Sequence, residues 1–374
     1  MEDMMNMPGK IRIQTNLNEV MERKKFKILS IDGGGIKGVY PAKLLSLLEA
    51  ELVNCKKNRI YEHFDLIIGT STGGILALSL ALGIPAQEVY QLYETHANTI
   101  FGKKKKFFFG QIFNSAHERN SLETLVREKF KKVNGGIDPR IGDCKTHVAI
   151  PVYDLLKGNP SVLKSKYHDN YVRDYHIPAY QAAMATSAAP TYFDPYSSKY
   201  TTLEGKEMPF NYKVDGGVMA NNPTMIGYIE AIKAFKVEQE DIEILSIGTG
   251  NRKFTEGGNQ SKFGLHYWMV KNGRKRLIDL FMQSQSQLVH NYMTLLVNGI
   301  DKTERENPNF IYDRMEKELT NDNYMEMDET DPVKIANYSE LAVAEYHENR
   351  SYIMKRHFYR VGKKVETADV DMNI

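Results

Sequence analysis

The sequence has few cysteines, almost no net charge and no long uninterrupted hydrophobic run. Its 374 residues include two cysteines, too few for a disulfide framework or a four-cysteine zinc site, so no structural metal is expected. Lys+Arg total 49 and Asp+Glu 47, and this near balance gives no reason to expect a nucleic-acid partner. With 27 glycines and 13 prolines, the chain is neither collagen-like nor of low complexity. We therefore expect a folded globular protein.

The start of the chain lacks the features of a secretory signal. Residues 1–4 are acidic where a signal needs positive charge, and no apolar segment with a small-residue cleavage site follows. The apolar stretch 64–82 has the length of a bilayer span, but its central run Gly69–Gly74 divides it into a short strand and a short buried helix. We expect a cytoplasmic protein that does not span a membrane.

Strand and helix patterns alternate from Phe26 to Gly250. The apolar runs Phe26–Ile31, Phe64–Ile68 and Ile242–Ile247 predict buried parallel strands that are covered on both faces. After residue 250 the strand patterns fade and the sequence reads as mostly helical. The sequence predicts a three-layer α/β/α fold with a mainly parallel central sheet over residues 26–250, after a poorly ordered lead-in over residues 1–25. Residues 251–374 are expected to form a helical C-terminal extension that packs on this domain or follows it.

The first chemical motif is a Gly-x-Ser-x-Gly pattern centred on Ser71 and flanked by Gly69 and Gly73. In a nucleophile elbow, such glycines permit a sharp strand-to-helix turn that exposes the serine hydroxyl. A predicted strand precedes the pattern and an apolar helix follows it, as this mechanism requires. The alternative is an ordinary tight turn in which Ser71 caps the helix.

The second motif is a glycine-rich turn, Asp32–Gly38, between a strand and a helix. Its consecutive backbone N–H groups at Gly33, Gly34 and Gly35 suit an anion, including the developing oxyanion of acyl transfer. Glycines at 33, 35 and 38 also fit the Gly-x-Gly-x-x-Gly fingerprint of dinucleotide-binding folds, which leaves a nucleotide-binding sensor or an oxidoreductase as the alternative. The acidic residue that a dinucleotide site needs about 20 positions later is missing, because Glu49 and Glu51 fall inside the predicted helix.

The third motif, Asp215-Gly216-Gly217, follows a short predicted strand. An aspartate at such a place reaches into a cleft across the carboxyl edge of a sheet. Taken alone, the motif fits a turn aspartate before two glycines better than a catalytic residue.

In content and order, the three motifs resemble those of the patatin-like phospholipase family of acyl hydrolases. Asp32–Gly38 resembles the family's oxyanion-hole motif, Gly69–Gly73 its nucleophile elbow and Asp215–Gly217 its catalytic-aspartate motif; Ala185–Pro190 and Asn221–Pro223 are similar to further signatures. The resemblance covers about residues 26 to 250, which are thereby identified as a patatin-like catalytic domain. Lys37 departs from the pattern, because many members have arginine there, and this puts any bidentate role of that side chain in doubt.

The resemblance implies a serine acyl hydrolase that needs no cofactor and uses a Ser-Asp dyad, with Ser71 as nucleophile and Asp215 as general base. It assigns the oxyanion hole to Gly33, Gly34 and Gly35, with Asp32, Lys37, Gly38, Gly69, Gly73 and Gly216 as supporting residues. An ordinary carboxylate is a weak base at neutral pH, so Asp215 must have a raised pKa, as partial burial would cause. A Ser-His-Asp triad is the alternative, and it would draw on one of four downstream histidines: His266, His290, His347 and His357.

Two basic clusters suggest further partners. The run Lys103, Lys104, Lys105, Lys106, Phe107, Phe108 and Phe109 joins four cations to three aromatic rings, a pairing that fits contact with an anionic phospholipid surface. Its alternative is three core phenylalanines beside solvated lysines. The second cluster, Lys271, Arg274, Lys275 and Arg276, fits either an anion site or a solvated helix face.

The compact bacterial form with a helical extension also resembles cyclic-nucleotide-activated phospholipases of antiphage signalling. That resemblance implies a cyclic di- or trinucleotide activator, peripheral contact with the inner membrane, and a homo-oligomer as one arrangement. A constitutive lipase and a catalytically inactive scaffold are the alternatives. The motifs themselves specify acyl transfer and no particular lipid head group.

Overall fold

The structure is a computed structural model that describes residues 24–101, 119–252, 267–268, 276–299, 308–320 and 325–359. The expected lead-in over residues 1–25 lies almost wholly outside these ranges, and the Lys103–Phe109 run lies outside them completely. Within the described ranges, no helix has both the length and the apolar character needed to cross a bilayer.

A mixed sheet forms the centre of the described chain. Its strands are β1 (Phe26–Ile31), β2 (Leu66–Gly69), β3 (His147–Asp154), β4 (Asn159–Lys164), β5 (Tyr196–Thr201), β6 (Glu207–Asp215), β7 (Ile242–Ile247) and β8 (Ile311–Met315). They follow the order β5-β6-β3-β2-β1-β7-β8, and β4 pairs with β3 off this path. The neighbours from β3 to β8 in this order pair in parallel, whereas β4 and β6 pair with β3 in antiparallel fashion and β5 pairs with β6 in the same way.

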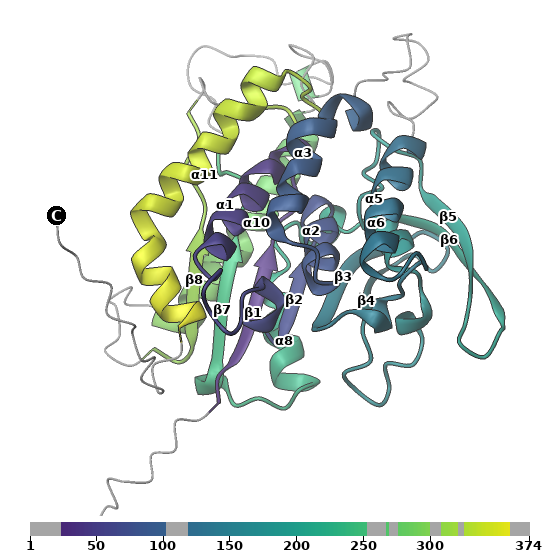
Figure 1. Cartoon of the computed structure of the whole chain (residues 1–374), viewed down its shortest axis with the longest axis horizontal. Helices are drawn as coiled ribbons and strands as arrows, with labels where there is room; N and C mark the ends of the chain where they lie inside the picture. Colours follow the sequence, from purple (N-terminus) through teal and green to yellow (C-terminus); the bar gives the residue numbers. More distant parts are fainter. Residues whose placement is uncertain are drawn as a thin grey trace, which may run out of the picture.

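Helices cover both faces of this sheet (Figure 1). They are α1 (Val39–Ala50), α2 (Thr72–Ala81), α3 (Ala86–Phe101), α5 (Asn120–Val133), α6 (Ala179–Thr186), α7 (Gly217–Ala220), α8 (Thr224–Lys233), α10 (Arg276–Asn298) and α11 (Pro332–Ile353). Short 3-10 turns η1 (Gly35–Gly38), η2 (Ile60–Glu62), η3 (Ile141–Asp143), η4 (Asp174–His176) and η5 (Gln239–Asp241), and a π-helical turn η7 (Met354–Phe358), complete the chain.

Successive side chains of β1 point to opposite faces of the sheet, and they belong to two different hydrophobic cores. Leu29 and Ile31 belong to the larger core cluster, with α1, α2, α3 and α11, while Ile28 belongs to a second cluster with α8 and α10. Figure 1 shows α1, α3 and α11 in front of the sheet and α8 and α10 behind it. These two cores confirm the predicted three-layer α/β/α fold with a mainly parallel sheet.

The sheet does not end at residue 250, where the strand patterns fade. Strand β8 pairs in parallel with β7, from Glu243 opposite Ile311 to Ile247 opposite Met315. Helix α10 therefore connects two neighbouring parallel strands across the back of the sheet. The sequence places the sheet within about residues 26–250, and β8 extends the sheet beyond that range. The division of the chain into domains at residue 250 stays a prediction.

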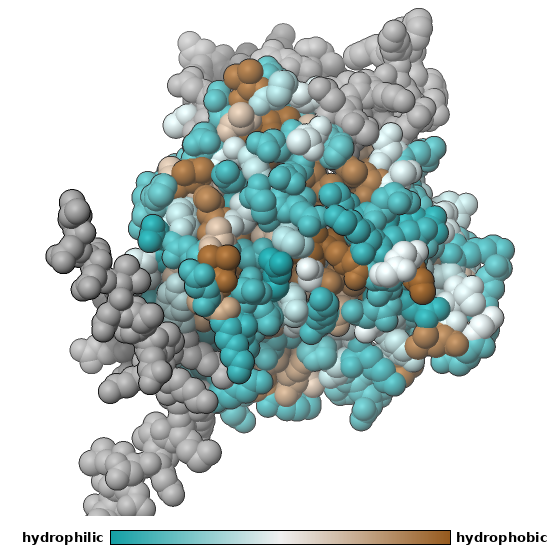
Figure 2. All heavy atoms as spheres, viewed as in Figure 1, coloured by the Kyte–Doolittle hydropathy of each residue, from teal (hydrophilic) through white to brown (hydrophobic). Residues whose placement is uncertain are grey.

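Seen from the side of α1, α3 and α11, the described surface is mostly hydrophilic. Hydrophobic side chains gather between α3 and α5, where the surface is hollowed (Figure 2). Leu92 and Tyr93 of α3 and Leu122 and Val126 of α5 border a cavity at this place.

Candidate active site

Ser71 occupies a strained turn between β2 and α2. Its φ of 55° and ψ of −124° lie in a region that side-chain-bearing residues rarely adopt. Glycine is needed on both sides, because a Cβ at Gly69 would lie 2.0 Å from the carbonyl oxygen of Gly73, and one at Gly73 would lie 2.3 Å from that of Ile31. The Ser71 N–H donates to Oγ1 of Thr186 at 3.0 Å, which fixes the turn from α6. The geometry is that of a nucleophile elbow.

Asp215 ends β6 and faces Ser71. β6 runs antiparallel to β3, and its last residue, Asp215, pairs with Val152 near the carboxyl end of β3. This pairing places Asp215 at the carboxyl edge of the parallel strands. The Ser71 hydroxyl donates to Oδ2 of Asp215 at 2.6 Å, and the Gly217 N–H donates to Oδ1 at 2.7 Å. Burial raises the pKa of Asp215 to about 7, although both hydrogen bonds oppose this rise. This pKa places the carboxyl in the range that suits a general base at neutral pH.

The glycine-rich turn lies beside this pair, but its amides are not equivalent. The Gly33 N–H donates to the carbonyl of Asn221 at 3.0 Å and is not available to a substrate. Among the described residues, the N–H groups of Gly34 and Gly35 meet no hydrogen-bond acceptor. Gly35 has a φ of +60° and lines the cavity. Of the three expected oxyanion donors, Gly34 and Gly35 are therefore the two whose amides have no acceptor in the described part of the chain.

The glycines of this turn pack closely against other parts of the chain. A Cβ at Gly34 would lie 2.5 Å from Oγ1 of Thr249, and one at Gly38 would lie 2.2 Å from Oγ1 of Thr72. The next amide, that of Ile36, donates to the carbonyl of Met327 at 2.9 Å. A side chain at Gly34 or Gly38 therefore has no room, and the amide of Ile36 is already used within the chain.

The residues expected to support the motifs have different roles in the structure. Lys37 is half-buried in η1 and does not line the cavity. Gly216 allows close packing, because a Cβ there would lie 2.3 Å from the carbonyl of Pro151. Asp32 is buried, and its carboxylate accepts hydrogen bonds from the guanidinium of Arg314 in β8. Burial raises the pKa of Asp32, and Arg314 opposes that rise.

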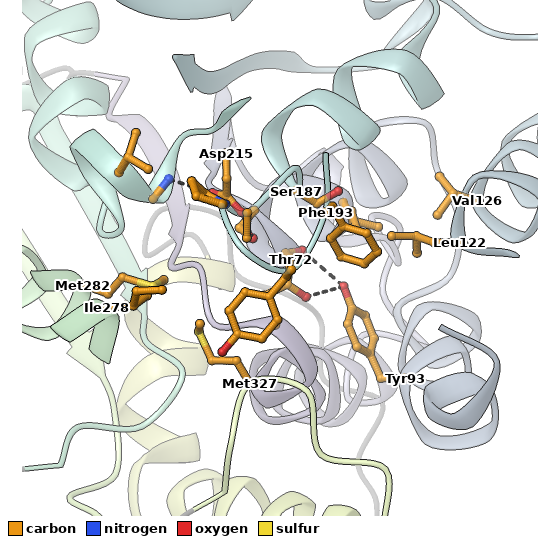
Figure 3. Close-up of a pocket in the computed structure, with 18 of the residues that line it drawn as sticks. Thr72, Tyr93, Leu122, Val126, Ser187, Phe193, Asp215, Ile278, Met282 and Met327 are labelled. Atoms are coloured by element: carbon orange, nitrogen blue, oxygen red, sulfur yellow. Dashed lines mark hydrogen bonds between the residues drawn. The ribbon is translucent and has the colours of Figure 1, made fainter. Parts of the chain in front are cut away.

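An apolar cavity of about 430 Å³ opens over Ser71 and Asp215. Figure 3 shows Ile278 and Met282 of α10 on one side of it, and Leu122 and Val126 of α5 on the other. Tyr93 of α3 is fixed at its wall by a 2.7 Å hydrogen bond from Oγ1 of Thr72 to its hydroxyl. Asp215 is the only Asp, Glu, Lys, Arg or His among the lining residues that the structure describes. The cavity therefore suits an apolar chain whose reacting group lies at Ser71.

The downstream histidines lie away from the dyad as far as they are described. Of the four that a triad would use, His290 contacts the hydroxyl of Tyr312, His357 contacts Asp313, and His347 is exposed on α11. His266 lies outside the described residues. Over the described ranges, no group of three or more His, Cys, Asp or Glu side chains is placed to hold a metal ion.

Several residues of the site carried no recognisable pattern in the sequence. Arg314 is a lone arginine in a five-residue strand, and Ile278 and Met282 belong to an ordinary helical pattern. Thr186 had a partial signal, because it belongs to the Ala185–Pro190 stretch. Asn221 also had a partial signal, because it belongs to the Asn221–Pro223 stretch, but the contact of its backbone carbonyl with Gly33 could not be read from that stretch.

Comparison with known proteins agrees with this geometry. The family described as "Patatin-like phospholipase" matches residues 29–228, which contain Ser71 and Asp215. A protein of Escherichia coli (strain TW11681) described as "cGAMP-activated phospholipase" is 33% identical over 61% of this chain and 63% of its own length. A protein of Pseudomonas aeruginosa (strain BWHPSA011 / Pa011) with the same description is 31% identical over 71% of this chain and 73% of its own. "Patatin-like protein 2" of Arabidopsis thaliana is 31% identical over 73% of this chain and 72% of its own.

Proposed function

Because the chain belongs to the patatin-like phospholipase family, we propose that it hydrolyses phospholipid esters with a dyad of Ser71 and Asp215. The observation that carries this proposal is the 2.6 Å hydrogen bond from the Ser71 hydroxyl to a buried carboxylate at the floor of an apolar cavity. A serine hydroxyl needs an adjacent base before it becomes a useful nucleophile. Asp215 is the base that the described site offers.

In the first half of the reaction, Oγ of Ser71 attacks the ester carbonyl while its proton moves to Oδ2 of Asp215. The carbonyl electrons move to the oxygen, which becomes an oxyanion. When this intermediate collapses, the bond to the leaving alcohol breaks and the alcohol takes the proton from Asp215. Water then attacks the acyl-enzyme carbonyl while Asp215 accepts its proton. When this second intermediate collapses, the bond from the acyl carbon to Oγ of Ser71 breaks, Oγ takes the proton back from Asp215, and the fatty acid leaves.

We assign the oxyanion to the free amides of Gly34 and Gly35. Gly33 instead holds the turn in place through the Asn221 carbonyl. A third donor is the N–H of Thr72, since the residue after the nucleophile supplies an oxyanion donor in nucleophile-elbow enzymes. A preorganised donor of this kind typically contributes about 10²–10³ in rate.

The substrate class follows from the cavity. Its lining includes Leu92, Leu122, Val126, Phe193 and Met282, and it offers no cation to a phosphate among its described lining residues. An acyl chain fits such a cavity, and the charged head group then remains outside it. The substrate is therefore an acyl lipid that is held by its chain.

We further propose that a cyclic nucleotide of the cGAMP class switches the enzyme on, and that it acts in antiphage defence from the cytoplasm on the inner membrane. The two bacterial relatives whose description names cGAMP support this. A physical reason supports it too, because a phospholipase in contact with its own cell's membrane must be held inactive until it is needed. The Lys103–Phe109 run remains a proposed membrane contact, and a homo-oligomer a proposed assembly.

The test is fatty-acid release from mixed phospholipid vesicles, with and without a panel of cyclic di- and trinucleotides. Wild type is compared with Ser71→Ala and Asp215→Ala. Ser79→Ala is the control, because Ser79 is a buried serine of α2, the helix that follows Ser71, and its hydroxyl donates to the Ile75 carbonyl. We expect both dyad variants to be inactive and the control to be active. Activity in Ser71→Ala would disprove the nucleophile, and equal rates with every nucleotide and with none would disprove the switch.

A further inference from the structure

Helix α10 has an outer face that carries no charge. From Leu280 to its last residue, Asn298, the helix contains no Asp, Glu, Lys or Arg. Phe281, Leu288, Tyr292 and Leu295 are 57%, 50%, 51% and 42% exposed. Their spacings of seven, four and three residues place them along one side of the helix. A helix on the surface of a soluble protein usually presents charged side chains on its outer side, so this face differs from the expected pattern.

The orientation of α10 is fixed by its other side, so these four side chains cannot turn inward. Met293 and Val297 are buried in the core cluster of α8 and β8. Ser286 is buried and accepts a hydrogen bond from Asn221 at 2.9 Å. The outer face, defined here as Phe281, Leu288, Tyr292 and Leu295, is therefore apolar surface that the fold leaves exposed.

The outer face begins at the mouth of the cavity. Phe281 both lines the cavity and belongs to this face, and the exposed residues Pro190 and Val218 lie with it among the lining residues. Gln285, one turn after Phe281, donates from Nε2 to the Val218 carbonyl at 3.2 Å, which ties α10 to this rim. The outer face thus meets the opening of the cavity at Phe281, and Leu288, Tyr292 and Leu295 continue it along α10, with the uncharged side chains of Ser284 and Asn291 exposed beside them.

We propose that this outer face is where the protein docks on a lipid bilayer, so that the acyl chain of a lipid passes from the membrane over Phe281 into the cavity. The inference rests on the proposed function, because it assigns the path of that function's substrate. An interfacial helix buries its apolar face about 5–10 Å into the boundary between head groups and acyl chains. A bilayer accommodates an apolar face without charges. Its lipids are also the substrate, which is needed at the Phe281 end of that face.

A second copy of the chain fits the same face less well. A partner seated along α10 as far as Phe281 would also cover the rim at Val218 and Pro190, and so would obstruct access to the cavity. The lack of charge on the outer face gives the lipid proposal a specific signature. Binding should persist on neutral phosphatidylcholine vesicles and at high salt, because salt screens charges and leaves apolar burial intact.

The experiment is sedimentation of the full-length protein with phosphatidylcholine vesicles, with and without cGAMP. A Ser71→Ala background keeps the vesicles intact. Leu288→Glu and Leu295→Glu test the face, since neither residue lines the cavity. Val333→Glu on α11 is the matched control, because Val333 is 65% exposed on a different helix. We expect each α10 variant to lower the vesicle partition coefficient about tenfold or more, and the control to leave it within about twofold.

A second readout separates this proposal from the proposed function. In the active background, the α10 variants should hydrolyse a soluble short-chain ester within about twofold of wild type while losing vesicle hydrolysis. Equal sedimentation of wild type and both variants, or no sedimentation of wild type in either condition, would overturn the docking face. A wild-type dimer that Leu288→Glu dissociates without changing sedimentation would assign the face to a second copy. Vesicle binding through α10 without any ester hydrolysis would instead overturn the proposed function alone.

Discussion

The guanidinium of Arg314 donates to both carboxylate oxygens of Asp32, at 2.8 and 3.4 Å, although the two residues are 282 positions apart. Both side chains are almost completely buried, at 6% and 2% exposure. Arg314 also donates to Oγ of Ser246 at 2.8 Å and pairs with Glu316. Since Asp32 directly precedes the glycine turn, the last strand of the sheet holds the turn that supplies the proposed oxyanion donors.

The first prediction concerns this ion pair. Arg314→Met leaves a buried carboxylate without its partner and should lower the free energy of unfolding by about 3–5 kcal/mol. Arg314→Lys keeps the charge but loses the two-pronged geometry, and should be intermediate. Urea unfolding measures these effects. Lys199→Met is the control, because Lys199 pairs with Glu207 where both side chains are mostly exposed, and it should change stability far less.

The double variant Asp32→Asn/Arg314→Met separates positioning from stability. Removing both charges should recover much of the stability, because the fully buried Asp32 carboxylate is gone and Glu316, the carboxylate that also loses Arg314, is less buried. If Arg314 positions the glycine turn, kcat on a soluble ester stays low in the double variant while KM is unchanged, because oxyanion stabilisation acts in the transition state. A double variant with wild-type kcat would assign Arg314 a structural role only.

The parts of this site that the sequence predicts are those with local causes. Gly69 and Gly73 are recognisable because a sharp turn needs residues without a side chain, and the flanking strand and helix have their own apolar patterns. The glycine turn before α1 is recognisable for the same reason. Asp215 has only a weak local signal, and its place opposite Ser71 was expected from the family resemblance.

The contribution of β8 could not be predicted in this way. Ile311–Met315 is short, half-buried and contains Asp313 and Arg314, so it lacks the apolar run that marks β1 or β7. Its place beside β7 depends on tertiary contacts, with α10 and, through the hydrogen bond from the Tyr352 hydroxyl to Asp313, with α11. The same holds for the cavity wall, where Ile278 and Met282 become lining residues only because α10 reaches the edge of the sheet.

The second prediction is a pH dependence of activity. Asp215 must be deprotonated to accept the Ser71 proton, and burial raises its pKa to about 7. For a soluble short-chain ester, kcat/KM should therefore rise with pH through about 7 and fall about tenfold per unit below it. Using a soluble ester keeps membrane binding out of the measurement. An acid limb near the ordinary carboxyl pKa of about 4 would contradict a buried base.

The third prediction is that Asp215 costs stability at neutral pH. The pKa of Asp215 is about 7 in the folded protein and about 4 in the unfolded chain. Between these two pH values Asp215 ionises in the unfolded chain but stays protonated in the folded protein, so the free energy of unfolding of the wild type falls as the pH rises from about 4 to about 7. Asp215→Asn has no such loss and keeps an acceptor for the Gly217 N–H. Above pH 7 it should be more stable than wild type by a few kcal/mol, and below about pH 4 the two should be alike. Urea unfolding at the two pH values decides, and equal stability at both would contradict the raised pKa.

The fourth prediction concerns acyl-chain length. Val126 is buried on the α5 wall of the cavity, opposite Ile278 and Met282 (Figure 3). Val126→Phe adds volume where the chain of a long acyl group would lie, and overpacking typically costs about 1–3 kcal/mol. We expect kcat/KM for long-chain esters to fall about tenfold relative to that for short-chain esters. Val133→Phe is the control, because Val133 ends the same helix, is 40% exposed and does not line the cavity. A uniform fall for all chain lengths would show that Val126 supports the fold without contacting the substrate chain.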